Sequence, residues 1–284
     1  MAQSWLQVSI RAGARDLQAL ADFVIERGSP GVVIKRGGLD AFFPSSRRDP
    51  ALRHQVRRFV AAHSRRPPHI EWRRVRPENW QHSWKRFIKP SRVGKSFWVT
   101  PPWLTPPRFR RRHVITIEPG MAFGTGTHGT TRACMEFLEA ARERLGPKAF
   151  TVLDVGTGSG ILAIAAALLG AAEIHAIDND PVALQVAAQN LRANGVMEKV
   201  FLSGQSVHAL RRRFAVVVAN LTADTIAALA EPLAKRVAAR GYLILSGLLH
   251  RQAPAAARRF AGDFRILERR RKREWTSLLL RRKA

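Results

Sequence analysis

The sequence predicts the α/β class: a doubly wound, mostly parallel sheet of seven strands, preceded by a smaller α+β domain. From Phe150 onward, five apolar strand-like runs alternate with helical stretches, and such βα alternation gives a parallel sheet. The closing segments "DFRILERR" and "EWTSLLLRR" leave almost no room between them. We therefore expect a terminal hairpin and an antiparallel strand at the edge of the sheet.

Residues 1–76 follow a different order of elements. "WLQVSI" alternates as a strand, "GVVIKR" and "DAFF" read as a strand pair, and "HIEWRRV" reads as a closing strand. Two helices are predicted between them by apolar residues at helical spacing: Leu17, Leu20 and Val24, then Leu52, Val56 and Val60. The order β-α-β-β-α-β predicts a ferredoxin-like domain. A domain of this fold does not by itself indicate a function.

Residues 77–112 are predicted to connect that domain to a second one over residues 113–284. The segment begins with "NWQHSWKRF", expected as one short helix, and continues with "KSFWVTPPWLTPPRFRRR". The prolines exclude a continuous helix, so we expect a semi-rigid spacer. Four tryptophans gather here: Trp80, Trp84, Trp98 and Trp103. They either pack between domains or form a platform on which nucleic-acid bases stack.

Composition limits the classes of protein. The sequence opens without a secretion signal pattern, so we expect a cytoplasmic location. The longest apolar run, "ILAIAAALLGAA" from Ile161, is too short to cross a bilayer and predicts a buried helix, so no membrane partner is expected. The single cysteine, Cys134, excludes an internal disulfide and a multi-cysteine metal site. It reads as a small core residue, and no metal is predicted.

The net charge of +27 is unevenly distributed. Residues 1–112 hold 24 Lys/Arg against 7 Asp/Glu, residues 113–198 hold 5 against 9, and residues 199–284 hold 19 against 5. A basic envelope around an acidic centre favours a polyanionic partner outside and a cationic or neutral ligand inside. The competing interpretation is compositional drift toward arginine.

"LDVGTGSG" places Gly156, Gly158 and Gly160 between the first strand of the second domain and a helix. Glycines there allow a sharp turn and close approach of backbone to a ligand, although a tight turn without a ligand has the same pattern. The spacing is GxGxG, and Ile161 occupies the third glycine position of a dinucleotide fingerprint. This favours an adenosyl amino acid over a nicotinamide dinucleotide.

Two carboxylates and an amide accompany that turn. Asp154 precedes the turn, where it could face an ammonium group, and Asp178 ends the second strand, where it could accept hydrogen bonds from both ribose hydroxyls. Asn220 ends the fourth strand in "VVANLTAD". Without the Pro-Pro-aromatic sequence that stacks planar nitrogens, an alkyl amine is favoured as the acceptor. Asn220 could equally be a helix N-cap.

These motifs have a recognisable combination. A Rossmann-like sheet of seven strands is shared by many methyltransferases that use S-adenosylmethionine. "PGMAFGTGTHGTT", "LDVGTGSGILAIAAALLGA", "AIDNDPVAL" and "VVANL", with "ENWQHSWKRF" and "EWTSLLLRR", resemble the bacterial methyltransferases of ribosomal protein L11, the PrmA family. The resemblance covers nearly the whole chain. Glu118 and Gly129 stand where that family more usually has aspartate and proline.

The resemblance implies a cytoplasmic enzyme that methylates the N-terminal α-amine and lysine ε-amines of ribosomal protein L11. It implies a ferredoxin-like domain that grips the substrate and a flexible connector. Implied cofactor contacts are Thr131, Gly156, Asp178 and Asn220, with Asp154, Gly158 and Gly160 in the same turn. Residues 124–131 are expected over the methionine end of the cofactor, with Phe123 as an apolar lining and Thr127 a further contact.

Catalytic roles are less constrained. Asn220 could orient the acceptor amine, and His128 is a candidate general base, although a histidine in a turn is more often a structural hydrogen-bonding residue. The glycine-rich loop could equally be an ordinary helix entry capped by Thr127 or Thr130. Two other functions stay open: a ribosomal or transfer RNA methyltransferase that uses the basic ends, and a non-catalytic ribosome-assembly factor. Ribosomal RNA is a candidate partner in either case.

Overall fold

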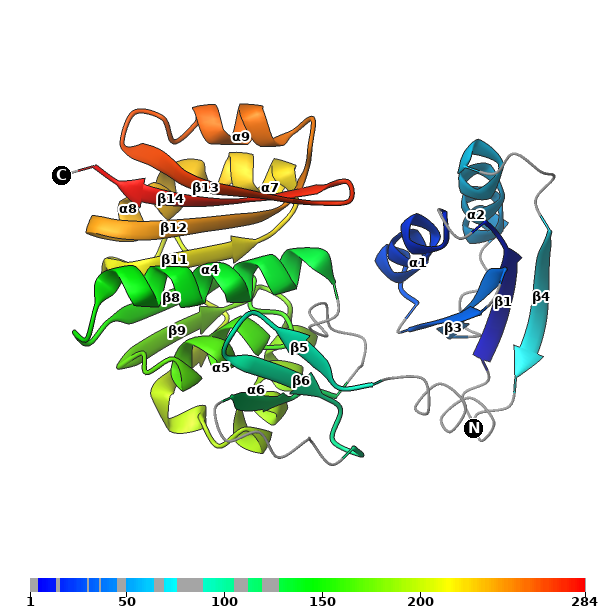
Figure 1. The fold of residues 1–284 in the computed structure, drawn as a ribbon, viewed down its shortest axis with the longest axis horizontal. Coiled ribbons are helices and arrows are strands. Elements are labelled where there is room, and N and C mark those ends of the chain that lie inside the picture. Colours follow the sequence, from blue (N-terminus) through cyan, green and yellow to red (C-terminus); the bar gives the residue numbers. More distant parts are fainter. Residues whose placement is uncertain are drawn as a thin grey trace. The chain divides into compact units, whose positions relative to one another are not determined.

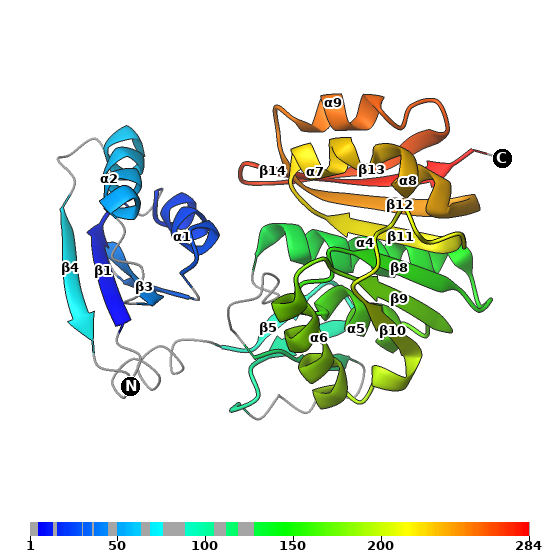
Figure 2. The ribbon, with the colours of Figure 1, turned by 180° about the vertical axis from the view of Figure 1, so that it is seen from behind.

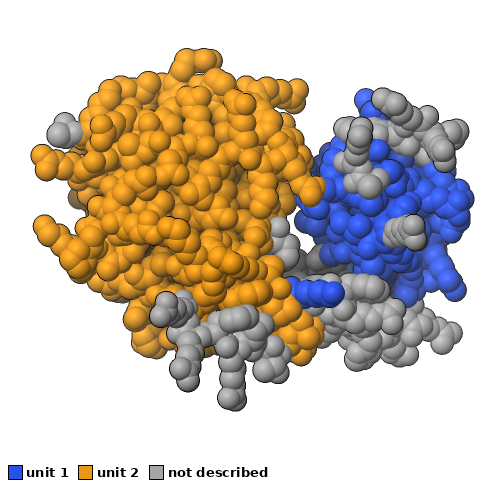
Figure 3. Space-filling model, in the orientation of Figure 1, with its two compact units in different colours: residues 1–89, 119–121 blue, residues 90–118, 122–284 orange. Residues whose placement is uncertain are grey.

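Figure 1 shows the fold of the computed structural model. The structure describes residues 5–13, 16–29, 31–35, 37–44, 50–63, 69–75, 89–104, 112–118 and 128–283. The chain divides into two compact units: unit 1 is residues 1–89 with 119–121, and unit 2 is residues 90–118 with 122–284 (Figure 3).

Unit 1 is a four-stranded antiparallel sheet with two helices. Its elements are β1 (Trp5–Arg11), α1 (Leu17–Glu26), β2 (Val32–Lys35), β3 (Gly38–Pro44), α2 (Pro50–His63) and β4 (Ile70–Val75). The strand order is β2-β3-β1-β4. Apolar residues of both helices, such as Leu20 and Val56, pack with Val8 and Phe43 of the sheet in one core. The predicted elements and their ferredoxin-like order are confirmed.

Unit 2 contains the seven-stranded sheet, in the order β10-β9-β8-β11-β12-β14-β13. Its elements from residue 151 are β8 (Thr151–Val155), α5 (Ile161–Leu168), β9 (Glu173–Ile177), α6 (Pro181–Ala193), the 3-10 turn Met197–Lys199, β10 (Val200–Ser203), β11 (Phe214–Asn220), α7 (Ala223–Ala228), α8 (Ala230–Arg236), β12 (Val237–Leu249), α9 (Ala253–Arg258), β13 (Phe264–Lys272) and β14 (Trp275–Arg282). The predicted α/β class and the hairpin are confirmed. The prediction that the antiparallel strand forms the edge is wrong. The antiparallel strand, β14, lies between β12 and β13, and β13 forms the edge.

Apolar cores cover both faces of this sheet. One core joins α4 (Gly129–Leu145), α5 and the inner face of β8, with Phe137, Ile164 and Val152 fully buried. The other joins α7, α8 and α9 to the opposite face, through residues such as Ile226 and Leu233. Figure 2 shows the two helical layers from behind. The apolar run from Ile161 forms the buried helix α5, as predicted. Within the described residues, no helix is long and apolar enough to cross a membrane.

The segment predicted as a spacer contains regular structure that the sequence analysis missed. Its strands β5 (Ser91–Val93) and β6 (Phe97–Thr100) form a three-stranded sheet with β7 (His113–Thr116). This small sheet belongs to unit 2, and its buried side chains Val93, Phe97 and Ile115 join the core beneath α4. Burial of these residues stabilises strands that are too short to show a periodicity. The predicted short helix, with Trp80 and Trp84, lies outside the described residues.

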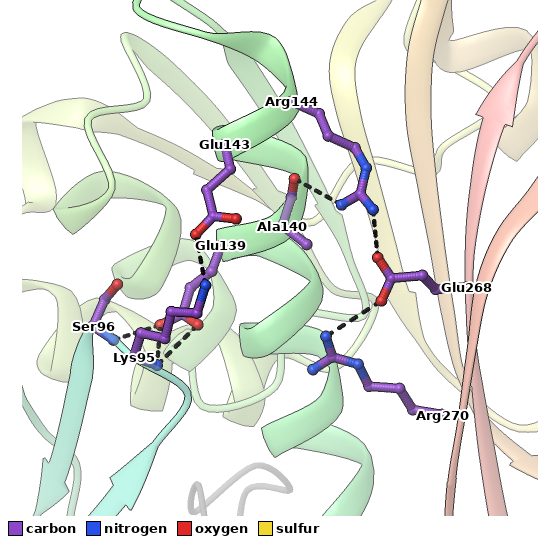
Figure 4. A network of polar contacts seen from close by, with 8 residues as sticks. All are labelled: Lys95, Ser96, Glu139, Ala140, Glu143, Arg144, Glu268 and Arg270. Atoms are coloured by element: carbon purple, nitrogen blue, oxygen red, sulfur yellow. Dashed lines mark hydrogen bonds and ion pairs between the residues drawn. The ribbon is translucent and has the colours of Figure 1, made fainter.

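Polar contacts fix α4 on two sides (Figure 4). The carboxylate of Glu139 accepts the backbone N–H of Lys95 at 3.1 Å and of Ser96 at 2.6 Å, in the turn between β5 and β6. On the other side, Arg144 donates to Glu268 of β13 at 2.5 Å. Arg270 of β13 pairs with Glu268 and with Glu136 of α4. The helix is therefore held between the small sheet and the terminal hairpin.

Candidate functional site

The polar residues singled out from the sequence lie in one row at the carboxyl edge of the sheet. Val155 of β8 is paired with Ile177 of β9 and with Ala219 of β11. Gly156, Asp178 and Asn220 each follow one residue later. Open α/β sheets bind their ligands at this edge. The structure thus brings together the candidate turn, the candidate ribose carboxylate and the candidate acceptor amide.

The turn after β8 depends on glycine. Gly156, Gly158 and Gly160 have φ values of +72°, +55° and +79°, a region that residues with a β-carbon rarely adopt. The N–H groups of Gly156 and Thr157 both donate to the carbonyl of Ile177, at 2.9 and 3.0 Å. A β-carbon at position 156 would overlap the side chain of Leu221. The turn is consequently fixed to the end of β9.

Asp154 is a buried carboxyl group with one oxygen left unsatisfied. Its Oδ2 accepts the hydroxyl of Thr157 at 2.7 Å, whereas Oδ1 is buried and has no hydrogen-bond partner among the described residues. Burial is the main cause that raises the pKa of Asp154, and the nearby charge of Asp178 adds to it. The hydrogen bonds from Thr157 and from the Ala163 backbone oppose the shift, and the resulting pKa is about 7. A cationic group placed at Oδ1 would favour the ionised carboxylate.

Asp178 is held by the backbone of the turn itself. Its Oδ2 accepts the N–H of Gly158 at 2.9 Å, and its Oδ1 accepts the N–H of Asp180 at 3.0 Å. Asp180 in turn caps α6 by accepting from Val182 at 2.8 Å. Each carboxylate oxygen retains a second lone pair. Asp178 is therefore fixed in place and still able to accept hydrogen bonds from a ligand.

Asn220 contacts the first turn of α4. Its Nδ2 donates to Thr131 Oγ1 at 3.5 Å, and Thr131 is almost fully buried. Its Oδ1 is buried without a hydrogen-bond partner in the part of the chain that the structure describes. The alternative reading of Asn220 as a helix N-cap is wrong, because Thr222 caps α7 by accepting from the N–H of Thr225. Asn220 thus offers an uncommitted acceptor beside Thr131.

The entry into α4 differs from both caps considered from the sequence. His128 occupies the N-cap position and makes no side-chain cap hydrogen bond. Its Nδ1 lies 2.7 Å from Thr130 Oγ1, and its ring meets Trp275 edge-on with centroids 5.5 Å apart. These contacts favour a structural role for His128. Phe123 and Thr127 lie outside the described residues.

Leu221 links the turn to the end of β12, a contact that sequence reasoning did not find. Gly247 has a φ of +84°, and a β-carbon there would overlap the Leu221 carbonyl. The Leu221 side chain covers Gly156 on its other side. The glycine inside the buried strand segment "LILSGLL" is the sequence signal for this close approach.

The arrangement provides a glycine cradle, a fixed carboxylate, and two buried oxygens, Asp154 Oδ1 and Asn220 Oδ1, that have no hydrogen-bond partner in the described part of the chain. Such a set can hold a ligand that carries a ribose and a cationic group, and can orient a hydrogen-bond donor beside it. In the described ranges no group of three or more His, Cys, Asp or Glu side chains could hold a metal ion. Cys134 is a fully buried core residue, as predicted.

Comparisons with known proteins match the chain to one family. A family model described as "Ribosomal protein L11 methyltransferase (PrmA)" matches residues 35–283. The chain is 37% identical to the ribosomal protein L11 methyltransferase of Citrifermentans bemidjiense, in an alignment 306 positions long that covers 99% of each chain. It is also 37% identical to that of Syntrophotalea carbinolica, over 98% of each chain.

Among solved structures, the ribosomal protein L11 methylase from Lactobacillus delbrueckii subsp. bulgaricus matches with a TM-score of 0.63 and 32% identity. That match covers 69% of this chain and 100% of the other. The sequence matches run through both units, whereas the structural match leaves out about a third of the chain.

Proposed function

The chain belongs to the family of ribosomal protein L11 methyltransferases, and on that premise we propose that it transfers methyl groups from S-adenosylmethionine to amino groups of ribosomal protein L11. The observation that carries this proposal is 37% identity over 99% of the chain to a relative of that name. The acceptors in the proposal are the N-terminal α-amine and lysine ε-amines. An RNA methyltransferase and a non-catalytic assembly factor are not favoured, because the relatives are named for the protein substrate.

The carboxyl edge of the sheet fits this donor. When bound, S-adenosylmethionine supplies an electrophilic methyl group on a cationic sulfur. In the proposal, Gly156, Gly158 and Gly160 line its backbone cradle, and Asp178 accepts from the ribose hydroxyls. Two observations support the fit: each Asp178 oxygen accepts only one hydrogen bond among the described residues, and all three glycines have the positive φ that a tight turn beside a ligand requires.

Asp154 is assigned to the ammonium group of the donor. A buried carboxyl whose pKa lies near 7 and whose Oδ1 has no partner among the described residues becomes more fully ionised at neutral pH when a cation lies beside it. Thr131, with Phe123 and Thr127 of the preceding loop, is assigned to the methionine end. His128 is given no catalytic role, because Thr130 and Trp275 already hold its ring.

The acceptor must reach the site as a neutral amine. A lysine of pKa about 10.4 is neutral in roughly one molecule per thousand near pH 7.4, which costs about 4 kcal/mol, whereas an α-amine of pKa about 8 costs under about 1 kcal/mol. Burial lowers the pKa of an amine, and alignment by a fixed hydrogen bond supplies part of the remainder. Asn220 Oδ1, buried without a partner in the described ranges, would accept one N–H and so orient the lone pair. Leu221 would form an apolar wall.

The proposal assigns substrate recognition to residues 1–76 and places the enzyme in the cytoplasm, where ribosomal proteins are made. The charge distribution suggests a second contact, with ribosomal RNA. Arg269, Arg271, Lys272 and Arg273 are exposed along the edge strand β13 and its turn. A row of cations on an edge strand also discourages aggregation, so its binding to RNA has to be measured.

The test is a radiolabelled methyl-transfer assay with purified ribosomal protein L11 and with naked ribosomal RNA in parallel, followed by mass spectrometry. We expect label on the α-amine and lysines of the protein. Asp178→Asn should lose that label, whereas the matched control Asp180→Asn removes a charge from the same loop and keeps a good helix cap. Label on RNA alone would overturn the proposal. RNA binding that fails to weaken with salt would contradict a contact between the basic residues of β13 and ribosomal RNA.

A further inference from the structure

Ser246 lies beside Asn220 on the adjacent strand of the sheet. The two residues are paired in the parallel register of β11 and β12. The N–H of Leu221, the residue after Asn220, donates to the carbonyl of Ser246 at 3.1 Å. Ser246 is fully buried. Its backbone therefore fixes the point at which the chain leaves β11 with the Asn220 side chain.

The Ser246 side chain contacts a different element. Its Oγ donates to the carbonyl of Thr130, in the first turn of α4, at 3.4 Å. The same Oγ lies 2.6 Å from Ser277 Oγ on β14, and either hydroxyl could be the donor in that pair. A hydroxyl has one hydrogen and two lone pairs. If Ser246 gives its hydrogen to Thr130, then Ser277 donates to Ser246.

These contacts close a ring around the acceptor amide. Asn220 Nδ2 donates to Thr131, which follows Thr130 in the chain. The Thr130 carbonyl accepts from the Ser246 hydroxyl. The Ser246 carbonyl accepts from the N–H of Leu221, the residue after Asn220. Two elements that are 89 residues apart in sequence meet in this ring. Within this ring, Ser246 is the residue besides Asn220 that links the start of α4 to the end of β11 by hydrogen bonds.

We propose that Ser246 is a positioning residue for Asn220: it holds the start of α4 at the end of β11, so that the Asn220 amide keeps its N–H₂ on Thr131 and its Oδ1 turned to the acceptor. This inference rests on the proposed function. Asn220 Oδ1 has no partner among the described residues, so within them the Thr131 contact is the one hydrogen bond of this side chain that opposes rotation of the amide. Withdrawal of α4 would remove that contact.

The experiment compares Ser246→Ala with Ser277→Ala. Both remove one buried hydroxyl from the same hydrogen-bonded pair, but only Ser246→Ala removes the contacts with α4, which are the hydrogen bond to the Thr130 carbonyl and that with the Cys134 side chain. We expect Ser246→Ala to lower kcat on ribosomal protein L11 by on the order of tenfold, and to raise the Kd for S-adenosylmethionine by a smaller factor, because Thr131 lies in the same turn. Ser277→Ala should change kcat by less than about twofold. Equal losses in the two variants would overturn the proposal.

A double-mutant cycle separates positioning from general destabilisation. In an Asn220→Ala background, Ser246→Ala should lower kcat no further, whereas its effect on the thermal midpoint should remain. The same fold loss of kcat in both backgrounds would contradict the role.

A third readout does not need activity. The side-chain amide signals of Asn220, assigned by their loss in Asn220→Ala, should shift in the nitrogen-15 spectrum of ligand-free Ser246→Ala and stay in place in Ser277→Ala. Unshifted signals in both variants would overturn the inference. If the unmodified protein fails to methylate ribosomal protein L11, the proposed function fails, and this spectrum still decides whether Ser246 positions Asn220.

Discussion

A carboxyl group is buried at the carboxyl edge of the large sheet and another at the side of α4 that faces the small sheet. The two differ in how many of their hydrogen bonds the chain itself supplies. Glu139, on the side of α4, accepts backbone N–H groups from Lys95 and Ser96. Gly94, with a φ of +54° and no space for a β-carbon, allows the turn to present both donors. Asp154, at the edge, has one hydroxyl partner and a buried Oδ1 without one among the described residues.

The difference separates scaffold from site. Buried polar groups in folded proteins are almost always hydrogen-bonded, so an orphaned oxygen points to a partner that arrives later. Glu139 completes its hydrogen bonds within the chain and fixes the small sheet to α4. Asp154 leaves its own incomplete in the same unit. Glu139 should therefore matter for stability and Asp154 for binding.

The largest effect should follow loss of the scaffold carboxylate. Glu139→Gln places an amide N–H₂ near donors, so at least one backbone N–H loses its acceptor, at a cost of about 3 kcal/mol. We expect the thermal midpoint, followed by circular dichroism, to fall by on the order of 10 °C. The matched control is Glu143→Gln, one turn further along α4 on an exposed side chain. Equal midpoints for the two variants would contradict the comparison.

Loss of the site carboxyl should have the opposite profile. Asp154→Asn removes the partner proposed for the cationic end of the donor, and we expect the Kd for S-adenosylmethionine to rise on the order of 100-fold at pH 8. The thermal midpoint of the ligand-free protein should not fall. Isothermal titration calorimetry measures the first quantity and a melting curve the second, with Asp180→Asn as control. An unchanged Kd would remove Asp154 from the site.

The raised pKa of Asp154 gives a pH dependence with a definite sign. The folded-state pKa of about 7 lies above the ordinary value of 3.8, so the folded chain binds this proton more tightly than the unfolded chain. Its contribution to stability is fully present below about pH 4 and is lost as pH rises through 7. Between pH 5 and 8 the unmodified protein should lose about 2 kcal/mol relative to Asp154→Asn, measured by urea unfolding at each pH. Parallel curves would contradict the burial of Asp154.

The sequence indicated the site better than the scaffold, for a physical reason. Gly156, Asp178 and Asn220 follow strands whose order is set by βα alternation, so their meeting at one edge is implied by topology. The Glu139 contacts join residues 43 and 44 positions apart, and reach a turn between strands of three and four residues that lack a detectable period. Ser246 was missed for a similar reason, because its partners depend on register and on the position of α4.

The smallest effect on the thermal midpoint should follow removal of the Lys95 charge, which distinguishes the ion pair from the backbone hydrogen bonds to Glu139. Lys95 carries both interactions: its N–H donates to Glu139, and its Nζ lies 3.2 Å from Glu143. The ion pair is exposed, with side chains 79% and 62% accessible, and such pairs contribute less than about 0.5 kcal/mol. Lys95→Met removes only the ion pair, so the thermal midpoint should move by less than about 2 °C, and high salt should abolish even that difference. A fall comparable to that of Glu139→Gln would mean that charge, rather than the turn's N–H groups, holds the small sheet against α4.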